Sequence, residues 1–264
     1  MKTSIESEIA RGLAAKAPGN AWQAAQQIAK HGHLAVRRAA DMLRSSDSNI
    51  REFGALILGY VDPRETALCA IAAGELTAAL ETQEPALVAQ AALSLARLPN
   101  ADVVKRLMYL RYVVQDGVRL ASAIALIPFG EEGVKGLIAL SADPDPEIRS
   151  WAIFGLSQLE LADEVVRDAL RAAADDSDAD VRGEALVALA EHRDDAFERL
   201  LFREMKHTNA PAWIAAACLA WPQHRFIGPL RRIRDALTPE QHGLWARRFD
   251  IAIDTCEAQS DSSG

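Results

Sequence analysis

One arrangement of apolar and small residues recurs along the chain at intervals of about 31 residues. Each copy has an anchor residue, a small residue four positions later and, in five of six copies, a Leu eight positions later. Residues spaced in this way lie on one side of an α-helix, and the small residue lets a neighbouring helix approach closely. We therefore predict one packed helix for each copy: Ile50/Gly54/Leu58, Leu87/Ala91/Leu95, Val118/Ser122/Leu126, Ile148/Ala152/Leu156, Val181/Ala185/Leu189 and Ala212/Ala216/Ala220.

The residues around each anchor predict how these helices begin. Most of the residues three positions before the anchors can accept backbone N–H groups at a helix start: Asp47, Glu84, Gln115, Asp145, Asp178 and Asn209. Pro85 and Pro146 follow two of them, at the first helical turn. Arginine follows the anchor in four copies, at Arg51, Arg119, Arg149 and Arg182. We expect each arginine to meet a loop carboxylate of its own or the adjacent repeat.

The segments between these helices predict a second, outer helix in most repeats, and further helices at both ends of the chain. The outer helices are expected near residues 64–81, 102–112, 131–142, 163–174 and 194–206. The terminal helices are expected near residues 5–15, 21–30, 34–44, 225–237 and 239–257. Helix pairs at a regular interval predict an all-α fold, an α-solenoid of antiparallel helix pairs.

No Gly/Ser-rich linker interrupts this array, so we predict a single continuous domain over residues 1–258. Residues 1–44 form a divergent N-terminal repeat or cap, residues 45–221 contain the repeats, and residues 222–258 form C-terminal capping helices. The polar residues 259–264 are expected to be a disordered tail.

The stretch from Asp143 to about Leu201 gives the pattern Asp-x-x-Ile/Val-Arg-x-x-Ala-x-x-x-Leu twice. It resembles HEAT repeats, and more closely the short bacterial HEAT-like repeats that also occur in phycobilin lyases. The resemblance implies an α–α superhelix over about residues 45–221. The family includes scaffolds, adaptors, chromophore lyases and a few DNA glycosylases, so the resemblance is specific for the fold and weak for the function.

The formal net charge of −8 disfavours a general nucleic-acid binder, because neutralising phosphates requires clustered Lys and Arg. The charge is unevenly distributed. Residues 143–195 carry 15 acidic and 5 basic side chains, whereas residues 225–248 carry 6 Arg and 2 acidic side chains. Such a division is more typical of steering a protein partner than of catalysis.

The composition also predicts a cytoplasmic protein without membrane segments. Cys69, Cys218 and Cys256 are odd in number and far apart, as expected of reduced thiols. Glu6 and Glu8 fall where a signal peptide would need its apolar stretch. The longest apolar runs are about half the length of a membrane span.

The sequence predicts neither catalytic residues nor a bound metal or cofactor, and we expect no enzyme activity. No H-E-x-x-H, C-x-x-C, G-x-S-x-G or phosphate-loop sequence occurs. His31-Gly32-His33 suits a turn better than a metal site. Gly130, Gly133 and Gly136 suit a helix cap with close packing, and the pairs Asp175-Asp176 and Asp194-Asp195 suit solvated capping carboxylates.

The candidate binding residues are those that fail to repeat on the exposed row of the inner helices, which lines the concave face of a solenoid. Three and ten positions after the anchors stand Phe53, Tyr60, Gln90, Arg97, Trp151, Gln158, Glu184 and Glu191. Phe53, Tyr60 and Trp151 are expected to be large groups on a surface, and aromatic and Arg residues often anchor interfaces. The alternative is that the aromatic residues fill gaps between neighbouring helices. Trp213, Trp221 and Trp245 are expected to be core residues.

These observations favour a non-enzymatic scaffold or adaptor that binds a protein or peptide partner with its concave face. One alternative is an antagonist or immunity protein that inhibits a specific partner. Two enzyme alternatives are a HEAT-type DNA glycosylase and a phycobilin-lyase-like enzyme. The glycosylase needs a basic groove, which the net charge opposes although Arg231, Arg232, Arg234, Arg247 and Arg248 form a local basic patch. The sequence fixes neither the partner nor the oligomeric state.

Overall fold

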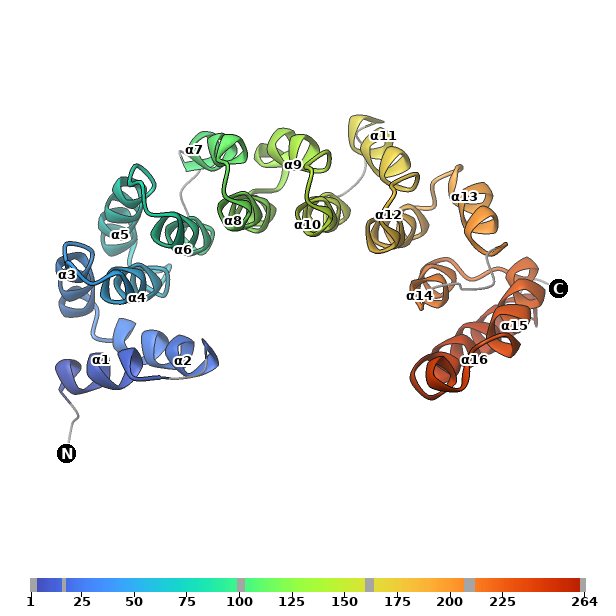
Figure 1. Ribbon diagram of the computed structural model, residues 1–264, viewed down its shortest axis with the longest axis horizontal. Helices are drawn as coiled ribbons and strands as arrows, with labels where there is room; N and C mark the ends of the chain where they lie inside the picture. Colours follow the sequence, from blue (N-terminus) through green and yellow to red (C-terminus); the bar gives the residue numbers. More distant parts are fainter. Residues whose placement is uncertain (1–3, 16–17, 99–102, 160–163, 207–211, 262–264) are drawn as a thin grey trace. The chain divides into compact units, whose positions relative to one another are not determined.

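The computed structural model describes residues 4–15, 18–98, 103–159, 164–206 and 212–261. Within these ranges the chain folds into α-helices and short 3₁₀ helices, without β-strands. The predicted all-α solenoid of helix pairs is therefore confirmed (Figure 1). No helix in the described part is both long and apolar enough to cross a membrane.

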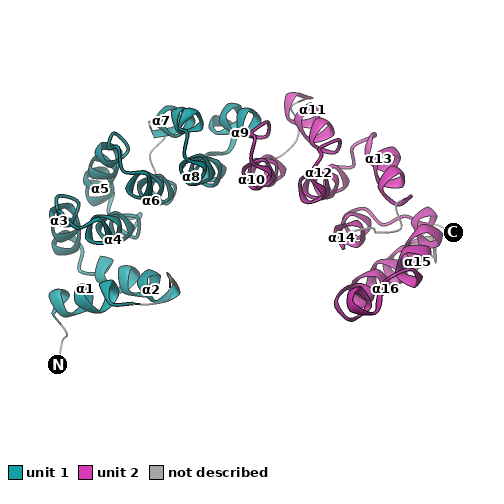
Figure 2. Ribbon diagram, in the orientation of Figure 1, with its two compact units in different colours: residues 1–140 teal, residues 141–264 magenta. Residues whose placement is uncertain are grey.

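The chain divides into two compact units, residues 1–140 and 141–264 (Figure 2). The single continuous domain over residues 1–258 stays a prediction.

Unit 1 has two layers of helices. The helices α2, α4, α6 and α8 contact one another in succession, and α3, α5, α7 and α9 each contact a helix of this row (Figure 1). The helices of unit 1 are α1 (Ile5–Leu13), α2 (Pro18–Ala29), α3 (His33–Met42), α4 (Ser48–Leu58), α5 (Thr66–Ala79), α6 (Pro85–Leu95), α7 (Val104–Tyr109), η2 (Leu110–Tyr112), α8 (Asp116–Leu126), η3 (Ile127–Glu132) and α9 (Val134–Leu140).

Unit 2 repeats this arrangement. Its helices are α10 (Pro146–Ser157), α11 (Glu164–Ala173), α12 (Ala179–Glu191), α13 (Phe197–Glu204), α14 (Trp213–Ala220), η4 (His224–Phe226), α15 (Ile227–Asp235) and α16 (Pro239–Asp261). The helices α10, α12, α14 and α16 contact one another in succession, and α11, α13 and α15 lie beside them (Figure 1). In each unit we call the even-numbered row, α2 to α8 or α10 to α16, the inner layer.

The last helix is longer than the sequence suggested. It continues to Asp261 and so includes the first three residues of the segment expected to be a disordered tail. Residues 262–264 lie outside the described part of the chain.

The repeat register is correct for five of the six copies. Their small and Leu positions are all buried, and their anchors are buried except for Ile50, which is half-buried. The register predicted for the sixth copy is wrong, because Ala216 is exposed whereas Ile214 and Cys218 are fully buried. The true anchor is therefore Ile214, two positions further on. A run of alanines has no clear apolar period, because Ala is accommodated on either face of a helix.

Three of the six predicted capping residues accept hydrogen bonds at a helix start. Asp47 accepts from the N–H of Asn49 at 2.9 Å, Asp145 from Glu147 at 2.8 Å and Asp178 from Asp180 at 2.9 Å. The side chains of Glu84 and Gln115 make no capping bond at the starts of α6 and α8. Asn209 lies outside the described residues.

The four repeated arginines bind the loops that precede their own helices. In each of them Nη1 donates to one or two backbone carbonyls five or six residues earlier in the chain, at 2.6–3.1 Å. The accepting carbonyls belong to Ser45, Val113, Val114, Asp143, Pro144, Asp176 and Ser177. Each guanidinium therefore holds the turn that starts its inner helix.

The same guanidinium groups pair with carboxylates, as predicted, and we call this set of pairs the arginine ladder. The pairs are Arg51–Glu84, Arg119–Asp116, Arg149–Asp176 and Arg182–Glu204. Two partners belong to the turn before the next inner helix and one to the arginine's own repeat. Two partners differ from the predicted loop carboxylates, because Asp116 is the first residue of α8 and Glu204 lies on the outer helix α13.

Two carboxylates expected to be solvated are instead enclosed by ion pairs. Asp194 is 1% exposed and accepts from Nη2 of Arg171 at 2.8 Å. Burial opposes ionisation of Asp194, but the Arg171 hydrogen bonds keep its pKa below the usual value. Nε and Nη2 of Arg149 each donate to Asp176 at 2.7 Å, and these bonds lower the pKa of Asp176 against the effect of its burial.

Small residues let the layers approach closely, as at Gly54 on α4. A Cβ at this position would lie 2.8 Å from the backbone oxygen of Ala39 and 2.9 Å from Cβ of Met42, both on α3. The glycine is required by this contact between neighbouring helices.

We expect Arg149→Met to lower the free energy of unfolding by about 3 kcal/mol at neutral pH, because it leaves the enclosed Asp176 carboxylate without its cation. Chemical denaturation of the two proteins measures this. The pKa of Asp176 is lowered in the folded state, so its stabilisation is present above the usual Asp pKa of about 3.9 and is lost as the pH falls through the folded value. The difference in the free energy of unfolding between the parent and the variant should therefore become smaller in acid.

Arg225→Met is the matched control in the same unit. Arg225 pairs with Glu198, but its side chain is 60% exposed, so the loss should stay below about 1 kcal/mol. Equal losses for the two variants would show that the ladder is no stronger than a surface ion pair.

We expect Gly54→Ala to destabilise the protein by about 1–3 kcal/mol, because the added methyl group overlaps the backbone of α3. Gly74→Ala on α5 is the control, since a Cβ there meets no atom within 4 Å. It should stabilise the protein by up to about 1 kcal/mol through helix propensity alone. Thermal unfolding of both variants tests the contact, and a stabilised Gly54→Ala protein would refute it.

Candidate functional site

Two of the predicted binding residues meet on the inner layer of unit 1. The guanidinium carbon of Arg97 lies 4.6 Å from the ring centroid of Tyr60 and 5.6 Å from that of Trp22. Tyr60 and Arg97 follow the C-terminal ends of α4 and α6, and Trp22 lies on α2. Consecutive repeats place positions ten residues after their anchors side by side, which explains why the tyrosine and the arginine meet. We call these three residues the aromatic–arginine cluster.

The aromatic–arginine cluster is open to solvent. Trp22 is 53% exposed, Arg97 is exposed and Tyr60 is half-buried. Within the described part of the chain, Arg97 forms no ion pair with a carboxylate. The faces of its guanidinium lie against aromatic rings, an attractive arrangement of cation and π-system, and its N–H groups can still bind an acceptor.

Phe53 is not the surface residue that the sequence suggested. It is buried at 6% exposure and packs on α1, where a Cβ at Gly12 would lie 2.2 Å from its ring. Phe53 therefore fills a gap between helices, the alternative considered for the aromatic positions. Gln90 is half-buried and donates to Oγ of Ser94 at 3.1 Å. Phe53 and Gln90 line the same hollow of about 460 Å³.

In unit 2, Trp151 lies at the surface as predicted. It is 37% exposed, and its ring meets that of Phe154 edge to face, with centroids 5.8 Å apart. Phe154, also 37% exposed, extends this apolar surface on α10. Gln158 and Glu191 are exposed at the ends of α10 and α12.

The inner layer of unit 2 contains a groove with a volume of about 740 Å³, which we call the unit-2 groove. Side chains from α10, α12, α14 and α16 form it, together with Ala212 just before α14. Its lining residues are Ser150, Asp180, Gly183, Glu184, Val187, Ala212, Trp213, Ala215, Ala216, Leu219, Arg248 and Ile251.

Trp213 packs against the only glycine in this lining. A Cβ at Gly183 would lie 2.5 Å from Cγ of Trp213, so the indole rests directly on the backbone of α12. The side chains of Trp213, Trp221 and Trp245 are all half-buried, so none of the three is the buried core residue that the sequence predicted. Trp221 stacks on the buried Phe197 with ring centroids 5.7 Å apart.

Glu184 is a half-buried carboxylate in the unit-2 groove. No residue of the described ranges donates a hydrogen bond to it or forms an ion pair with it. Burial raises the pKa of Glu184, and the negative charges of Asp180 and Glu191 raise it further. Of the predicted candidates, Glu184 is the one whose surroundings most disfavour its charge.

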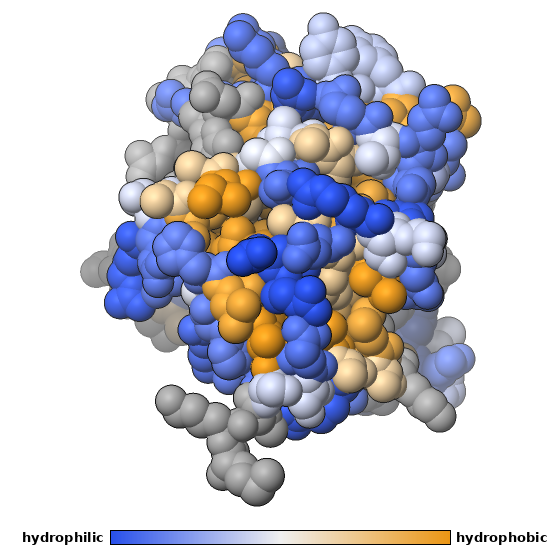
Figure 3. Space-filling view, turned by 90° about the vertical axis from the view of Figure 1, so that its left-hand side faces the viewer, coloured by the Kyte–Doolittle hydropathy of each residue, from blue (hydrophilic) through white to orange (hydrophobic). Residues whose placement is uncertain are grey.

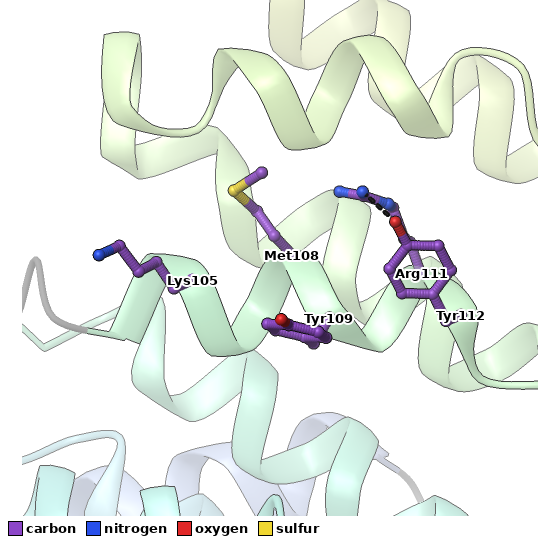
Figure 4. Close-up of a pocket in the computed structure, with 5 residues that line it drawn as sticks. All are labelled: Lys105, Met108, Tyr109, Arg111 and Tyr112. Carbon is purple, nitrogen blue, oxygen red and sulfur yellow. Dashed lines mark hydrogen bonds between the residues drawn. The ribbon is translucent and has the colours of Figure 1, made fainter.

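An aromatic surface on the outer layer of unit 1 was not predicted from the sequence. Tyr109 and Tyr112 are 72% and 68% exposed, with ring centroids 6.3 Å apart, and Arg111 lies over the ring of Tyr112 (Figure 4). Lys105 and Met108 complete a small hollow of about 260 Å³. Elsewhere on unit 1, the face seen in Figure 3 mixes apolar with hydrophilic residues.

The described residues contain no cluster of three or more His, Cys, Asp or Glu side chains suited to a metal ion. Nε2 of His31 lies 3.0 Å from a carboxylate oxygen of Glu8, and Gly32 has the positive φ of a turn. Cys69, Cys218 and Cys256 are buried free thiols, and burial raises the pKa of each.

Residues 134–220 match the HEAT-repeat family. This stretch consists of HEAT repeats, as the resemblance implied. The match covers a third of the chain and includes most of the residues of the unit-2 groove. No curated protein matches the sequence.

Solved structures share the fold of this chain. The Escherichia coli protein YibA has a TM-score of 0.70 at 20% identity, over 97% of this chain and 93% of that one. A chain of the Pds5–Scc1 complex has a TM-score of 0.53 at 8% identity, over 90% of this chain and 42% of that one. A chain of the CpcE–CpcF phycocyanin lyase complex from Nostoc has 17% identity, over 97% and 96% of the two chains. Its TM-score of 0.46 carries no argument, and the other two similarities show the fold alone.

We expect Glu184→Gln to stabilise the protein at neutral pH, because it removes a half-buried charge that no described side chain compensates. The pKa of Glu184 is raised in the folded state. The parent protein therefore keeps its free energy of unfolding in acid and loses part of it as the pH rises through the folded-state pKa. The advantage of the variant should therefore vanish in acid. Urea denaturation at neutral and acidic pH measures it.

Glu147→Gln is the control, since Glu147 is exposed in the same unit. A surface substitution of this kind should change the stability by less than about 0.5 kcal/mol. A Glu184→Gln protein that is less stable than the parent at neutral pH would contradict the absence of a compensating cation.

Proposed function

We propose that the protein is a non-enzymatic scaffold that binds a protein or peptide partner along its inner-layer helices. The aromatic–arginine cluster carries this proposal. Trp22 on α2 meets Tyr60 and Arg97, which follow α4 and α6. Aromatic and Arg side chains are the residues most enriched at the centres of interfaces.

The contrast between Arg97 and the arginine ladder supports this role. Of the repeated arginines, Arg119 is buried and the other three are half-buried, and all four bind carbonyls and carboxylates of the chain itself. Arg97 is exposed, and aromatic rings rather than described carboxylates hold its guanidinium in place. A side chain that is already ordered loses less conformational entropy on binding.

An antagonist of a basic protein is the second candidate function, and the charge of unit 2 favours it. Residues 141–264 carry 23 Asp and Glu against 14 Lys and Arg, whereas residues 1–140 carry 14 against 15. An acidic surface attracts a basic partner and speeds its association. Addition of the purified protein to an activity assay of a captured partner distinguishes inhibition from simple scaffolding.

The DNA-glycosylase alternative has less support, because part of the C-terminal basic patch is already neutralised. Arg231 pairs with Glu257, and Arg234 pairs with Asp235 and Asp250. No residue set in the described part of the chain favours the phycobilin-lyase alternative.

We expect Arg97→Ala to weaken binding of a physiological partner by about 2 kcal/mol, or roughly 30-fold, as for a central interface residue. Affinity purification with mass spectrometry identifies the partner, and calorimetry with the purified pair measures the change. Arg37→Ala is the control, because Arg37 is an exposed arginine on the outer helix α3 of the same unit. Equal affinities for the parent and Arg97→Ala proteins would remove the cluster from the interface.

A further inference from the structure

The unit-2 groove combines an apolar surface with an acidic side. Val187, Leu219 and Ile251 contribute aliphatic side chains from three different helices, and Leu219 and Ile251 are 37% and 46% exposed. Its volume of about 740 Å³ is that of a pocket for a few side chains, not for a folded domain. An apolar partner surface would therefore have to enter as a narrow element.

The acidic side of the groove follows one face of α12. Asp180 and Glu184 are four residues apart and both line the groove, and Glu191 comes seven residues after Glu184. Residues at these spacings lie on the same side of a helix. The one basic residue of the lining, Arg248, comes from α16.

Glu184 differs from the other enclosed carboxylates of unit 2. Asp176, Asp194 and Glu204 each bind an arginine of the unit. Glu184 has no such partner in the described residues, although desolvation and two nearby acids oppose its charge. A cation brought by another molecule would relieve this repulsion.

We propose that the unit-2 groove binds an amphipathic helix of a partner protein, with aliphatic side chains against Val187, Leu219 and Ile251 and a Lys or Arg beside Glu184. An amphipathic helix presents apolar residues every three or four positions and flanks them with charged ones. The proposal rests on the proposed function, because it names the chemistry of the partner that the scaffold binds.

Charge complementarity indicates that the helix of the partner is basic. The groove lies in the unit with the acidic excess, and two acids line it against one arginine. An acidic helix would add repulsion to the cost of burying Glu184. A second copy of the chain is disfavoured as the occupant, because it carries the same net charge of −8.

Three synthetic peptides of about 18 residues, or five helical turns, test the proposal by calorimetry. The first places Leu on one helical face and Lys on the other. The second replaces every Lys by Glu, and the third has the composition of the first in an order without helical periodicity. We expect the first peptide to bind at least about tenfold more tightly than either of the others.

Two pairs of variants place this binding in the groove. Glu184→Gln should lower the affinity for the first peptide, with Leu and Lys, by about tenfold. Glu147→Gln removes the same charge outside the groove and should leave this affinity unchanged. Ile251→Ser should weaken it similarly, whereas Leu244→Ser should not. Leu244 lies on the same helix and is 67% exposed, but it does not line the groove.

Each contrary outcome overturns the groove proposal. Equal binding of the ordered and scrambled Lys peptides, or equal losses for Glu184→Gln and Glu147→Gln, would show attraction to the acidic surface alone. Tighter binding of the second peptide, which carries Glu in place of Lys, would show that the groove prefers an acidic helix. If no peptide binds while a physiological partner still depends on Arg97, the groove assignment fails and the scaffold function stands.

Discussion

The arginine that follows the anchor in four of the six copies makes the interaction on which the inner helices of those repeats depend. Its guanidinium binds the carbonyls that precede its own helix and, in two of the four copies, a carboxylate from the turn before the next inner helix. These carbonyls belong to the turn before the helix, so they have no partner in its hydrogen-bond ladder and need another donor. The arginine therefore fixes both the entry of the chain into an inner helix and, in those two copies, the spacing to the next one.

The charged residues of the protein fall into those that pair within the fold and those that do not. Arg51, Arg119, Arg149 and Arg182 are used within the fold, and so are the buried carboxylates Asp194 and Glu204. Arg97 and Glu184 are not among the repeated residues. Neither forms an ion pair with another side chain in the described part of the chain, so both can still meet an opposite charge on a partner.

The periodicity of the sequence predicted the helix pairs, the register of five copies and the arginine ladder, because each rests on residues close in sequence or one repeat apart. The Ala-rich copy at residues 212–220 could not be placed, since alanine marks neither face of a helix. The burial of Phe53 depends on Gly12, 41 positions earlier in a segment that does not repeat. Trp22 and the unit-2 groove likewise require several helices to be placed in three dimensions.

The contact between Phe53 and Gly12 limits how far this protein is modular. Repeat proteins invite the exchange, deletion or duplication of whole repeats, because each repeat contacts only its neighbours. The copy that starts at Ile50 carries a large ring where the copy at Ile148 carries Trp151 at the surface, and that ring needs a residue without a side chain on α1. The N-terminal helices and the first complete repeat are therefore inseparable in any shortened or recombined version of the chain.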